Sequence, residues 1–315
     1  MEKIIVKSFA KVNLSIDVKG LLPNGYHEVE MVMQQVGLYD SVEIEFEPWD
    51  EEGYKVELKT NLPYLPTDER NLAYKGANIF LEYLAYKIRY KVPNGVFHIN
   101  IKKKVPVAAG LAGGSGNGAA VILGLNRLLD AKLPLKTLCE ISKELGSDVP
   151  FSMMGQAKAN WVLGKEINQD PLATSSALAT GRGTDVMPIK GLDAYLILVK
   201  PAIGVSTKEV YQGIDNVQIS KRPDNEALIE GLKEEDRDKI YESMANVLEE
   251  YTLDHYPIVK EIKEMLEKET EAEKVLMSGS GPTVFAIYKD KETAQKYCFE
   301  MRRKGYECYW ARTTK

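Results

Sequence analysis

The stretch Lys104–Leu129, "KVPVAAGLAGGSGNGAAVILGLNRLL", carries the strongest fold signal in this sequence. Five glycines fall within the nine residues Gly110–Gly118, directly after an apolar segment. Glycine costs backbone entropy and contributes little packing, so a cluster this dense indicates that something approaches the backbone closely. Apolar residues then recur at a spacing that predicts a helix after the glycines. They are Val121, Ile122, Leu125, Leu128 and Leu129.

A glycine-rich turn that leads into a helix offers backbone N–H groups and the positive end of the helix dipole, which suits phosphate. The Walker pattern is absent because no lysine lies inside the loop. Gly114, Gly116 and Ala119 meet a relaxed dinucleotide fingerprint, but the loop lies deep in the chain after a proline-containing strand. A tight structural turn without a ligand is the remaining alternative.

Composition narrows the class of protein. A chain of 315 residues is long for one hydrophobic core and predicts two domains. The net charge of −5 gives no sign of a nucleic-acid or membrane partner. Three cysteines and three histidines are dispersed without metal-ligand spacing, so we expect neither a disulfide scaffold nor a structural zinc site. No run reaches the roughly 18 apolar residues of a membrane span, and no signal peptide is apparent, so we expect a cytoplasmic protein.

Strand and helix patterns alternate without strict βαβ order, which predicts an α+β fold. The opening "KIIVKSFAKVNLSIDVKG" is expected to form two short strands, and Lys239–Glu250 one helix. The segment Gln156–Ser176 has weak periodicity and is broken at Asp170-Pro171. We expect a loop or an inserted excursion there.

Two further stretches stand out. "GSDVPF" places Asp148 after a predicted helix, where an aspartate is commonly a turn former or a cap. "MSGSGPTVF" is a second glycine turn between two apolar strands, and alone it indicates a hairpin.

Taken together, these stretches resemble one family. "PVAAGLAGGSGNGAA" is similar to the phosphate loop of the GHMP kinases. "FAKVNLSIDVKGLLPNGYHEVEMVMQQVGLYDSVEIE", "RNLAYKGA", "LGSDVPF", "ALATGRG", "KPAIGVSTKEVY" and "LMSGSGPTVFAIY" follow in the order found in the 4-diphosphocytidyl-2-C-methyl-D-erythritol kinase family. The resemblance runs from Lys7 to about Tyr288, and seven motifs in register are far more specific than any one of them.

The resemblance implies a two-domain GHMP kinase fold. Residues 1–190 would form an ATP-binding domain like domain 2 of ribosomal protein S5, and residues 191–315 a ferredoxin-like α/β sandwich. It also implies an ATP- and Mg²⁺-dependent kinase of the non-mevalonate isoprenoid pathway. The substrate would be a small molecule that carries a cytidine diphosphate group. A monomer or a weak homodimer is expected.

The resemblance also implies roles for individual residues. Asp148 would take the proton from the substrate hydroxyl, with Lys11 beside it. A lysine next to a carboxylate keeps the carboxylate ionised and lowers the charge cost at the reacting oxygen. The alternative for Lys11 is an exposed lysine on a strand.

Nucleotide-site residues follow from the same resemblance, and Ser115 would offer its hydroxyl to phosphate or Mg²⁺. The set is Asn71, Lys104, Pro106, Ala108, Ala109, Gly110, Leu111, Ala112, Gly113, Gly114, Ser115, Gly116 and Asn117.

In the substrate site, Tyr26 and Tyr211 would stack on the two faces of cytosine, and His27 would bind its edge. Stacking of a base on an aromatic ring is worth on the order of 1–3 kcal/mol. The full substrate set is Asn13, Tyr26, His27, Asp148, Thr207 and Tyr211. Otherwise, Tyr26 is a half-buried aromatic residue of a turn.

Two departures from the family pattern matter. The family loop usually reads G-G-S-[ST]-[DN]-A-A, so Gly116 replaces a hydroxyl residue and Gly118 an alanine. We expect weaker ATP binding or slower turnover, and a gain in kcat/KM from Gly116→Ser. The second departure is Gln156–Ser176, which separates "DVPF" from "ALATGRG". Alternatively, "GQAKANWVLGKE" forms the family strand and "ALATGRG" is a displaced copy.

Three rival functions remain at this point. A GHMP kinase with another alcohol substrate is the first, and a substrate panel separates it. A non-catalytic nucleotide-binding protein is the second, and it predicts ATP binding without turnover. A dinucleotide oxidoreductase is the third, and absence of NAD binding excludes it.

Overall fold

The computed structural model describes residues 3–23 and 25–315 of the chain. The chain forms two compact units, and each unit contains several segments of the sequence. The first comprises the residues up to Ala10 together with Tyr39–Val105 and Ala112–Ser175. The second comprises Lys11–Leu38, Pro106–Leu111 and Ser176–Lys315. The glycine-rich segment therefore passes from the second unit to the first after Leu111.

Two long strands contribute to both units. They are β1 (Lys3–Leu21), which was expected to form two short strands, and β2 (His27–Pro48). The prediction that this segment divides into two strands was wrong. Alternate residues of β1 are buried up to Ala10, and both faces are buried after it, so the strand continues without interruption. Strand β1 pairs with β2.

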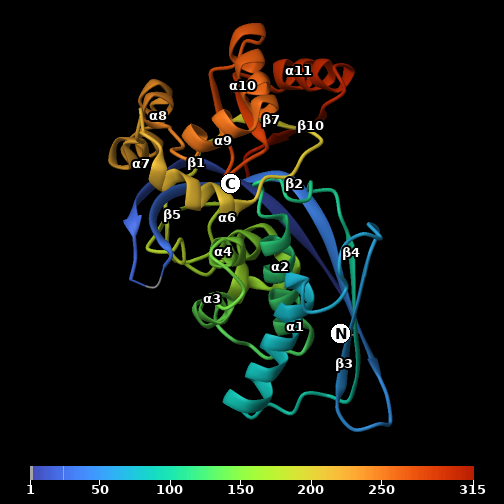
Figure 1. Cartoon of the computed structure of the whole chain (residues 1–315). Helices are drawn as coiled ribbons and strands as arrows, with labels where there is room; N and C mark the ends of the chain where they lie inside the picture. Colours follow the sequence, from blue (N-terminus) through green and yellow to red (C-terminus); the bar gives the residue numbers. More distant parts are fainter. Residues whose placement is uncertain (1–2, 24) are drawn as a thin grey trace. The chain divides into compact units, whose positions relative to one another are not determined.

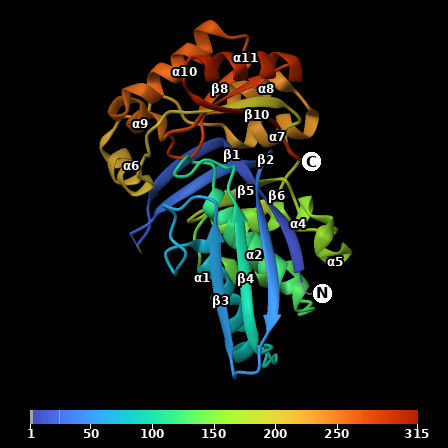
Figure 2. The ribbon, with the colours of Figure 1, turned by 90° about the vertical axis from the view of Figure 1, so that its right-hand side faces the viewer.

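The first unit joins a sheet to a layer of helices. Residues Ser41–Pro48 of β2 pair antiparallel with β4 (Gly95–Lys102), and β3 (Tyr54–Thr60) pairs parallel with β4. The helices lie on one face of β3 and β4 (Figures 1 and 2). They are α1 (Leu72–Glu82), which a π-helical turn η1 (Tyr83–Lys87) extends, α2 (Gly113–Leu128), α3 (Leu135–Ser142), α4 (Val149–Ala159), the short 3-10 helix η2 (Trp161–Leu163) and α5 (Lys165–Asn168).

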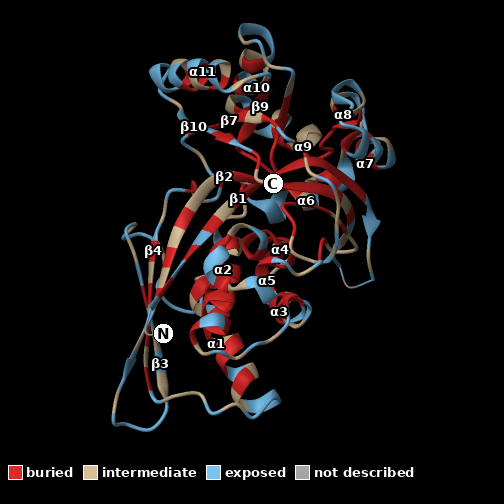
Figure 3. Ribbon diagram, turned by 180° about the vertical axis from the view of Figure 1, so that it is seen from behind, coloured by how far each residue is buried: buried red, intermediate tan, exposed pale blue. Residues whose placement is uncertain are grey.

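Helix α2 is the centre of this layer and is buried over most of its length (Figure 3). The predicted helix is confirmed, but it begins at Gly113, among the glycines rather than after them. Gly118 of α2 and Gly76 of α1 lie at a close crossing, where a Cβ on Gly76 would lie 3.2 Å from the Gly118 carbonyl oxygen. Two glycines thus let the helix backbones approach each other.

The segment Gln156–Ser176 is not a loop or an inserted excursion, so that prediction was wrong. Its first residues complete α4, and η2 and α5 follow. The alternative that "GQAKANWVLGKE" forms a strand is also wrong, since "ALAT" lies in the strand β5 (Ser176–Thr180).

The second unit contains two sets of strands. Residues Met31–Gln34 of β2 pair antiparallel with β5, which pairs with β6 (Asp185–Pro188). A separate antiparallel sheet has the order β10-β7-β9-β8. Its strands are β7 (Tyr195–Lys200), β8 (Lys274–Met277), β9 (Val284–Tyr288) and β10 (Glu307–Arg312). Helices α10 (Pro257–Glu269) and α11 (Lys291–Arg303) lie on one face of this sheet (Figure 2).

Aspartates begin several helices of the second unit by accepting a backbone N–H of the first turn, as Asp224, Asp236 and Asp290 do. The single helix expected over Lys239–Glu250 is divided into two helices, because the backbone adopts an extended conformation at Met244. The helices are α6 (Thr207–Gly213), the 3-10 helix η3 (Ile214–Asn216), α7 (Asn225–Glu234), α8 (Arg237–Ser243), α9 (Glu249–His255), α10 (Pro257–Glu269) and α11 (Lys291–Arg303). Across the described residues, none of the helices has the length and apolar character needed to cross a membrane.

Candidate active site

The glycines of the loop are explained first by close approach of the chain to itself. A Cβ on Gly110 would overlap the Ser278 carbonyl oxygen, and the Ser278 Oγ donates to the Gly110 carbonyl oxygen at 3.0 Å. A Cβ on Gly113 would lie 3.0 Å from Val105 Cγ1. These two glycines are needed for packing whether or not a ligand binds.

Further along α2 the same explanation holds for two more glycines. A Cβ on Gly116 would lie 2.7 Å from the Ser8 Oγ, and one on Gly118 would lie 3.1 Å from the Leu72 carbonyl oxygen. Gly114 differs, because its Cβ would meet only Leu72 Cδ1, at 3.8 Å, and the residue is exposed. Gly114 is therefore the glycine of this cluster that leaves room for a ligand at the backbone.

The backbone before α2 takes an uncommon conformation. Ala108, Gly110 and Ala112 have positive φ angles of 50°, 72° and 54°. A positive φ at alanine costs on the order of 1–3 kcal/mol, and such strain gathers at binding and catalytic sites. Two strained alanines within five residues of each other indicate a backbone shaped for contact with something other than its own side chains.

Helix α2 begins without a side-chain cap. Ala112 occupies the N-cap position, and its side chain makes no capping hydrogen bond to the first turn. The Gly116 N–H already donates to the Ala112 carbonyl oxygen at 2.8 Å. The N–H groups before Gly116 have no partner in the helix itself, and the positive end of the helix dipole adds to their attraction for an anion. This helix start is suited to phosphate.

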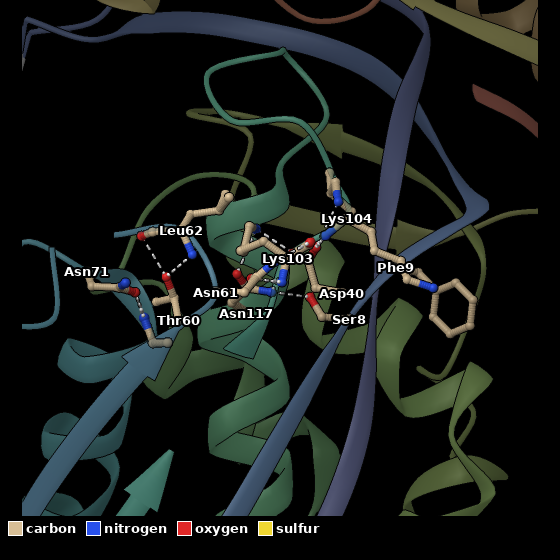
Figure 4. Close-up of polar contacts among 12 residues, drawn as sticks. Ser8, Phe9, Asp40, Thr60, Asn61, Leu62, Asn71, Lys103, Lys104 and Asn117 are labelled. Atoms are coloured by element: carbon tan, nitrogen blue, oxygen red, sulfur yellow. Dashed lines mark hydrogen bonds and ion pairs between the residues drawn. The ribbon is translucent and has the colours of Figure 1, made fainter. Parts of the chain in front are cut away.

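A buried cluster of polar side chains lies beside this helix start, and we call it the Asp40 cluster: Asp40, Lys103, Asn117 and Ser8 (Figure 4). Asp40 is fully buried, and the Lys103 side chain is 6% exposed. The Lys103 Nζ donates to the Asp40 Oδ2 and, at 2.9 Å, to the Asn117 Oδ1. The Asn117 Nδ2 donates to Asp40 Oδ2 and to the Ser8 Oγ, both at 2.9 Å.

Sequence reasoning missed three members of this cluster and gave Asn117 a different role. Asn117 was predicted to bind nucleotide, but its side chain is 3% exposed and its amide is engaged within the cluster. Asp40 lies in β2 together with several other acidic residues, so its charge alone did not distinguish it in the sequence.

Two other predicted nucleotide-site residues have definite structural partners. Lys104 is exposed, and its Nζ lies 5.7 Å from the centroid of the Tyr39 ring. Asn71 is the N-cap of α1: its Oδ1 accepts from the Ala73 N–H at 3.0 Å, and its Nδ2 donates to the Pro66 carbonyl oxygen at 2.8 Å. Contact of either side chain with a nucleotide stays a prediction.

Asp148 lies at the N-terminus of α4, where its carbonyl oxygen accepts from the Ser152 N–H at 3.1 Å. Its half-buried side chain makes no capping bond to the helix. Asp148 is therefore not the simple cap that the sequence left as the alternative, and its role as a base stays a prediction.

Lys11 and Asn13 belong to the second unit and are buried, with Lys11 4% exposed. The Lys11 Nζ donates to the Asn13 Oδ1 at 2.6 Å, and the Lys11 N–H donates to the Leu111 carbonyl oxygen at 3.1 Å. The alternative of an exposed strand lysine is wrong. Lysines are almost never buried without a polar partner, so this ammonium is held at a defined place.

The residues predicted to bind the cytosine ring gather in the second unit. The His27 and Tyr211 rings lie 5.5 Å apart between centroids, and the His27 Nε2 is 2.9 Å from the Asp215 Oδ1. Tyr26 is 56% exposed, and the Arg182 guanidinium lies 5.0 Å from the centroid of its ring. Asp215 and Arg182 were not predicted, although Arg182 belongs to the "ALATGRG" motif.

Thr207, the last predicted substrate residue, is exposed at the start of α6. Its Oγ1 lies 2.9 Å from the Ser280 Oγ. Ser280 and Ser278 belong to the "MSGSGP" turn, so this turn contacts both Thr207 and Gly110. The interpretation of the turn as a hairpin is confirmed, since β8 and β9 flank it and pair antiparallel.

Comparison with known proteins identifies the family. Models described as the GHMP kinases N terminal domain and GHMP kinases C terminal match residues 71–156 and 228–307. A 4-diphosphocytidyl-2-C-methyl-D-erythritol kinase of Clostridioides difficile is 43% identical over 311 residues, which cover 98% of this chain and 95% of the relative. The chain belongs to the 4-diphosphocytidyl-2-C-methyl-D-erythritol kinase family. A relative with the same name from Alkaliphilus metalliredigens is 40% identical and covers 92% of this chain and 89% of its own.

Solved structures confirm the predicted two-domain GHMP kinase fold and its α+β class. A crystal structure of 4-(cytidine 5'-diphospho)-2C-methyl-D-erythritol kinase superposes with a TM-score of 0.74 at 24% identity, and 99% of this chain and 100% of that chain are covered. Homoserine kinase from Cytophaga hutchinsonii gives a TM-score of 0.69 at 20% identity, with 100% and 95% covered. A member of this family is an ATP-dependent small-molecule kinase.

Proposed function

We propose that this protein transfers the γ-phosphoryl group of ATP to the 2-hydroxyl of 4-diphosphocytidyl-2-C-methyl-D-erythritol, in the non-mevalonate isoprenoid pathway. The names of its relatives support this reaction. The observation that carries it in the structure is the uncapped start of α2, with the open backbone at Gly114.

Phosphoryl transfer requires positioning and charge stabilisation more than covalent chemistry. The N–H groups of the first turn of α2 hold the ATP phosphates, because these groups are unpaired in the helix and the dipole is positive there. The strained backbone from Ala108 to Ala112 presents further main-chain groups to the nucleotide. Pro106, Ala109 and Leu111 are buried and support this backbone from within.

Mg²⁺ would be held by the phosphates together with the Ser115 hydroxyl. The described residues contain no group of three or more His, Cys, Asp or Glu side chains placed to hold a metal. A Ser115 hydroxyl at the helix start fits an ion that keeps most of its ligands from water and phosphate. When bound, the ion neutralises charge on the phosphates.

Asp148 takes the proton of the substrate hydroxyl, and Lys11 stabilises negative charge at the reacting oxygen. Asp148 lies at the N-terminus of α4 with a half-buried side chain that makes no capping bond to the helix, and a carboxylate within reach of a hydroxyl can accept its proton. The bond from Lys11 to Asn13 fixes the ammonium. His27, Tyr26 and Tyr211 bind the cytosine.

A coupled ADP-release assay tests the proposal, with Mg-ATP and 4-diphosphocytidyl-2-C-methyl-D-erythritol as substrates. ADP release should require both substrates and should fall by about 100-fold or more in Asp148→Ala, since a positioned base contributes roughly 10²–10⁴-fold. Asp170→Ala, at a turn of the same unit, serves as the matched aspartate control. Release with homoserine or mevalonate instead would support another GHMP kinase, and ATP binding without any turnover would support the non-catalytic alternative.

We also propose that the protein acts in the cytoplasm as a monomer or weak homodimer, and that residues 1–190 and 191–315 are its functional domains. Sedimentation velocity at two protein concentrations would test the oligomeric state.

A further inference from the structure

The start of helix α2 is fixed in space by an unusual device. A helix start is commonly held by a side-chain cap, but a cap would occupy the N–H groups that a phosphate needs. Here Ala112 provides no cap, and the anchor is Asn117, which lies further into the helix. The amide of Asn117 bonds to β1 through Ser8 and to β2 through Asp40.

Asp40 also binds the backbone of the residues that precede the glycine-rich segment. Its Oδ1 accepts from the N–H groups of Lys104 at 2.6 Å and Val105 at 2.8 Å. Its Oδ2 accepts from Lys103 and Asn117. One carboxylate thus bonds to the residues that enter the segment and to the helix that leaves it (Figure 4).

An ion pair this deeply buried is poor evidence for stability, because the loss of hydration opposes the attraction between the charges. Burial of such a pair is better explained by the geometry that it specifies. The four bonds to Asp40 have different directions and use both oxygens, so they define the position of the Lys104 backbone relative to Asn117. Apolar packing alone would leave that separation less well fixed.

We propose that Asp40 is a positioning residue of the kinase reaction, which sets the shape of the phosphate-binding backbone through Asn117 and Lys103. It does not contact ATP. This inference rests on the proposed function, since it assigns the anion site to the first turn of α2. It also gives the predicted nucleotide-site residue Asn117 an indirect role, since its side chain is buried.

The test compares Mg-ATP binding by calorimetry and steady-state kinetics in the full-length protein. In Asp40→Asn the new amide oxygen still accepts from Lys104 and Val105, whereas its NH₂ group faces the donors of Lys103 and Asn117. We expect the Kd and KM for ATP to rise on the order of 10- to 100-fold, because small displacements of binding groups have effects of this size. The KM for the cytidine-bearing substrate should change by less than about twofold.

Asn126 offers a matched control within the same helix. It is 4% exposed, and its side chain accepts from the Leu133 N–H at 3.0 Å and donates to the Leu133 carbonyl oxygen at 3.1 Å. Asn117→Ala and Asn126→Ala remove the same buried amide at opposite ends of α2. Both should lower Tm, and only Asn117→Ala should raise the Kd for ATP.

Equal ATP affinity of Asn117→Ala and Asn126→Ala would overturn the inference. So would a rise in the KM of both substrates together, which indicates general loosening. If Asp40→Asn does not fold, Asn117→Ala and the milder Ser8→Ala decide the question against the same control. Failure of the unaltered protein to bind or turn over ATP would instead refute the proposed function.

Discussion

Gly116 is the position where the structure most changes the expectation from sequence. A serine there was expected to restore a phosphate contact and raise kcat/KM for ATP. The structure argues against this expectation, because a Cβ at Gly116 would point into the protein. It would lie 2.7 Å from the Ser8 Oγ, 3.3 Å from the Phe9 carbonyl oxygen and 3.4 Å from the Gln156 Nε2. A side chain at this position enters the packed interior of the first unit. We therefore predict that Gly116→Ala and Gly116→Ser destabilise the protein and give no gain in activity.

The size of the effect follows from three contributions. Alanine is favoured over glycine within a helix by about 1 kcal/mol. Against this, an added group in a packed interior costs about 1–3 kcal/mol. Rotation of the Ser8 hydroxyl away from the new methyl group breaks its bond with Asn117, and an unsatisfied buried donor costs about 1–3 kcal/mol. The unfolding free energy of Gly116→Ala should therefore fall by roughly 1–5 kcal/mol.

Urea unfolding followed by circular dichroism measures this change, with two comparison variants. Gly114→Ala lies in the same turn but faces open space, so it should be neutral or stabilising by up to about 1 kcal/mol. Ser8→Ala/Gly116→Ala removes the hydroxyl that the methyl group meets. The unfolding free energy of this double variant should exceed the value expected from adding the effects of the two single substitutions by about 1 kcal/mol or more. Independent sites deviate from additivity by only roughly 0.5 kcal/mol. Equal stability of Gly114→Ala and Gly116→Ala would refute the reasoning.

Three other changes have defined outcomes. Gly110→Ala should lower the unfolding free energy by more than about 2 kcal/mol, since it combines a positive φ with an overlap at a carbonyl oxygen; unchanged urea unfolding would contradict this. His27→Ala removes a hydrogen-bond partner of the base edge, so it should raise the KM for the cytidine-bearing substrate about 5- to 100-fold and leave the KM for ATP unchanged, and a parallel rise in both would argue against its role. Burial lowers the pKa of Lys274 to about 8, so the unfolded chain binds more protons and stability should rise between about pH 8 and pH 10. Lys274→Met should remove that rise when Tm is compared at the two ends of the range.

Helix α4 shows why one part of the fold escaped prediction. Gln156 and Asn160 are buried polar residues whose side-chain amides bond to the backbone of β1. The Gln156 amide pairs with both the N–H and the carbonyl oxygen of Phe9, and the Asn160 amide does the same with Lys7. Polar residues on the buried face abolish the apolar periodicity from which a helix is recognised. The pattern was misleading because the C-terminal part of the helix contributes hydrogen bonds to a strand, whereas its larger apolar residues lie before Gln156.

The candidate site divides in a similar way. Asp148, Lys11 and the glycine-rich segment lie in short motifs and were found from sequence. Asp40 was not, because its partners Lys103 and Asn117 are 63 and 77 residues away, and no local spacing connects them. A network of this kind is specified by the topology, in which β2 lies beside β4, rather than by any one segment.

The glycine cluster predicted the correct fold, but most of its glycines are required by packing within the chain rather than by contact with a ligand. Four of its five glycines lie against other parts of the chain, and Gly114 alone opens to a ligand. The departures at Gly116 and Gly118 therefore need not weaken ATP binding, because the missing side chains would have met Ser8 and the Leu72 carbonyl oxygen. A side chain at position 116 and the side chain at position 8 would occupy the same space. A larger residue at 116 therefore requires a compensating change near Ser8. Restoring the family residue at 116 alone is a substitution in the packed interior and does not repair the phosphate site.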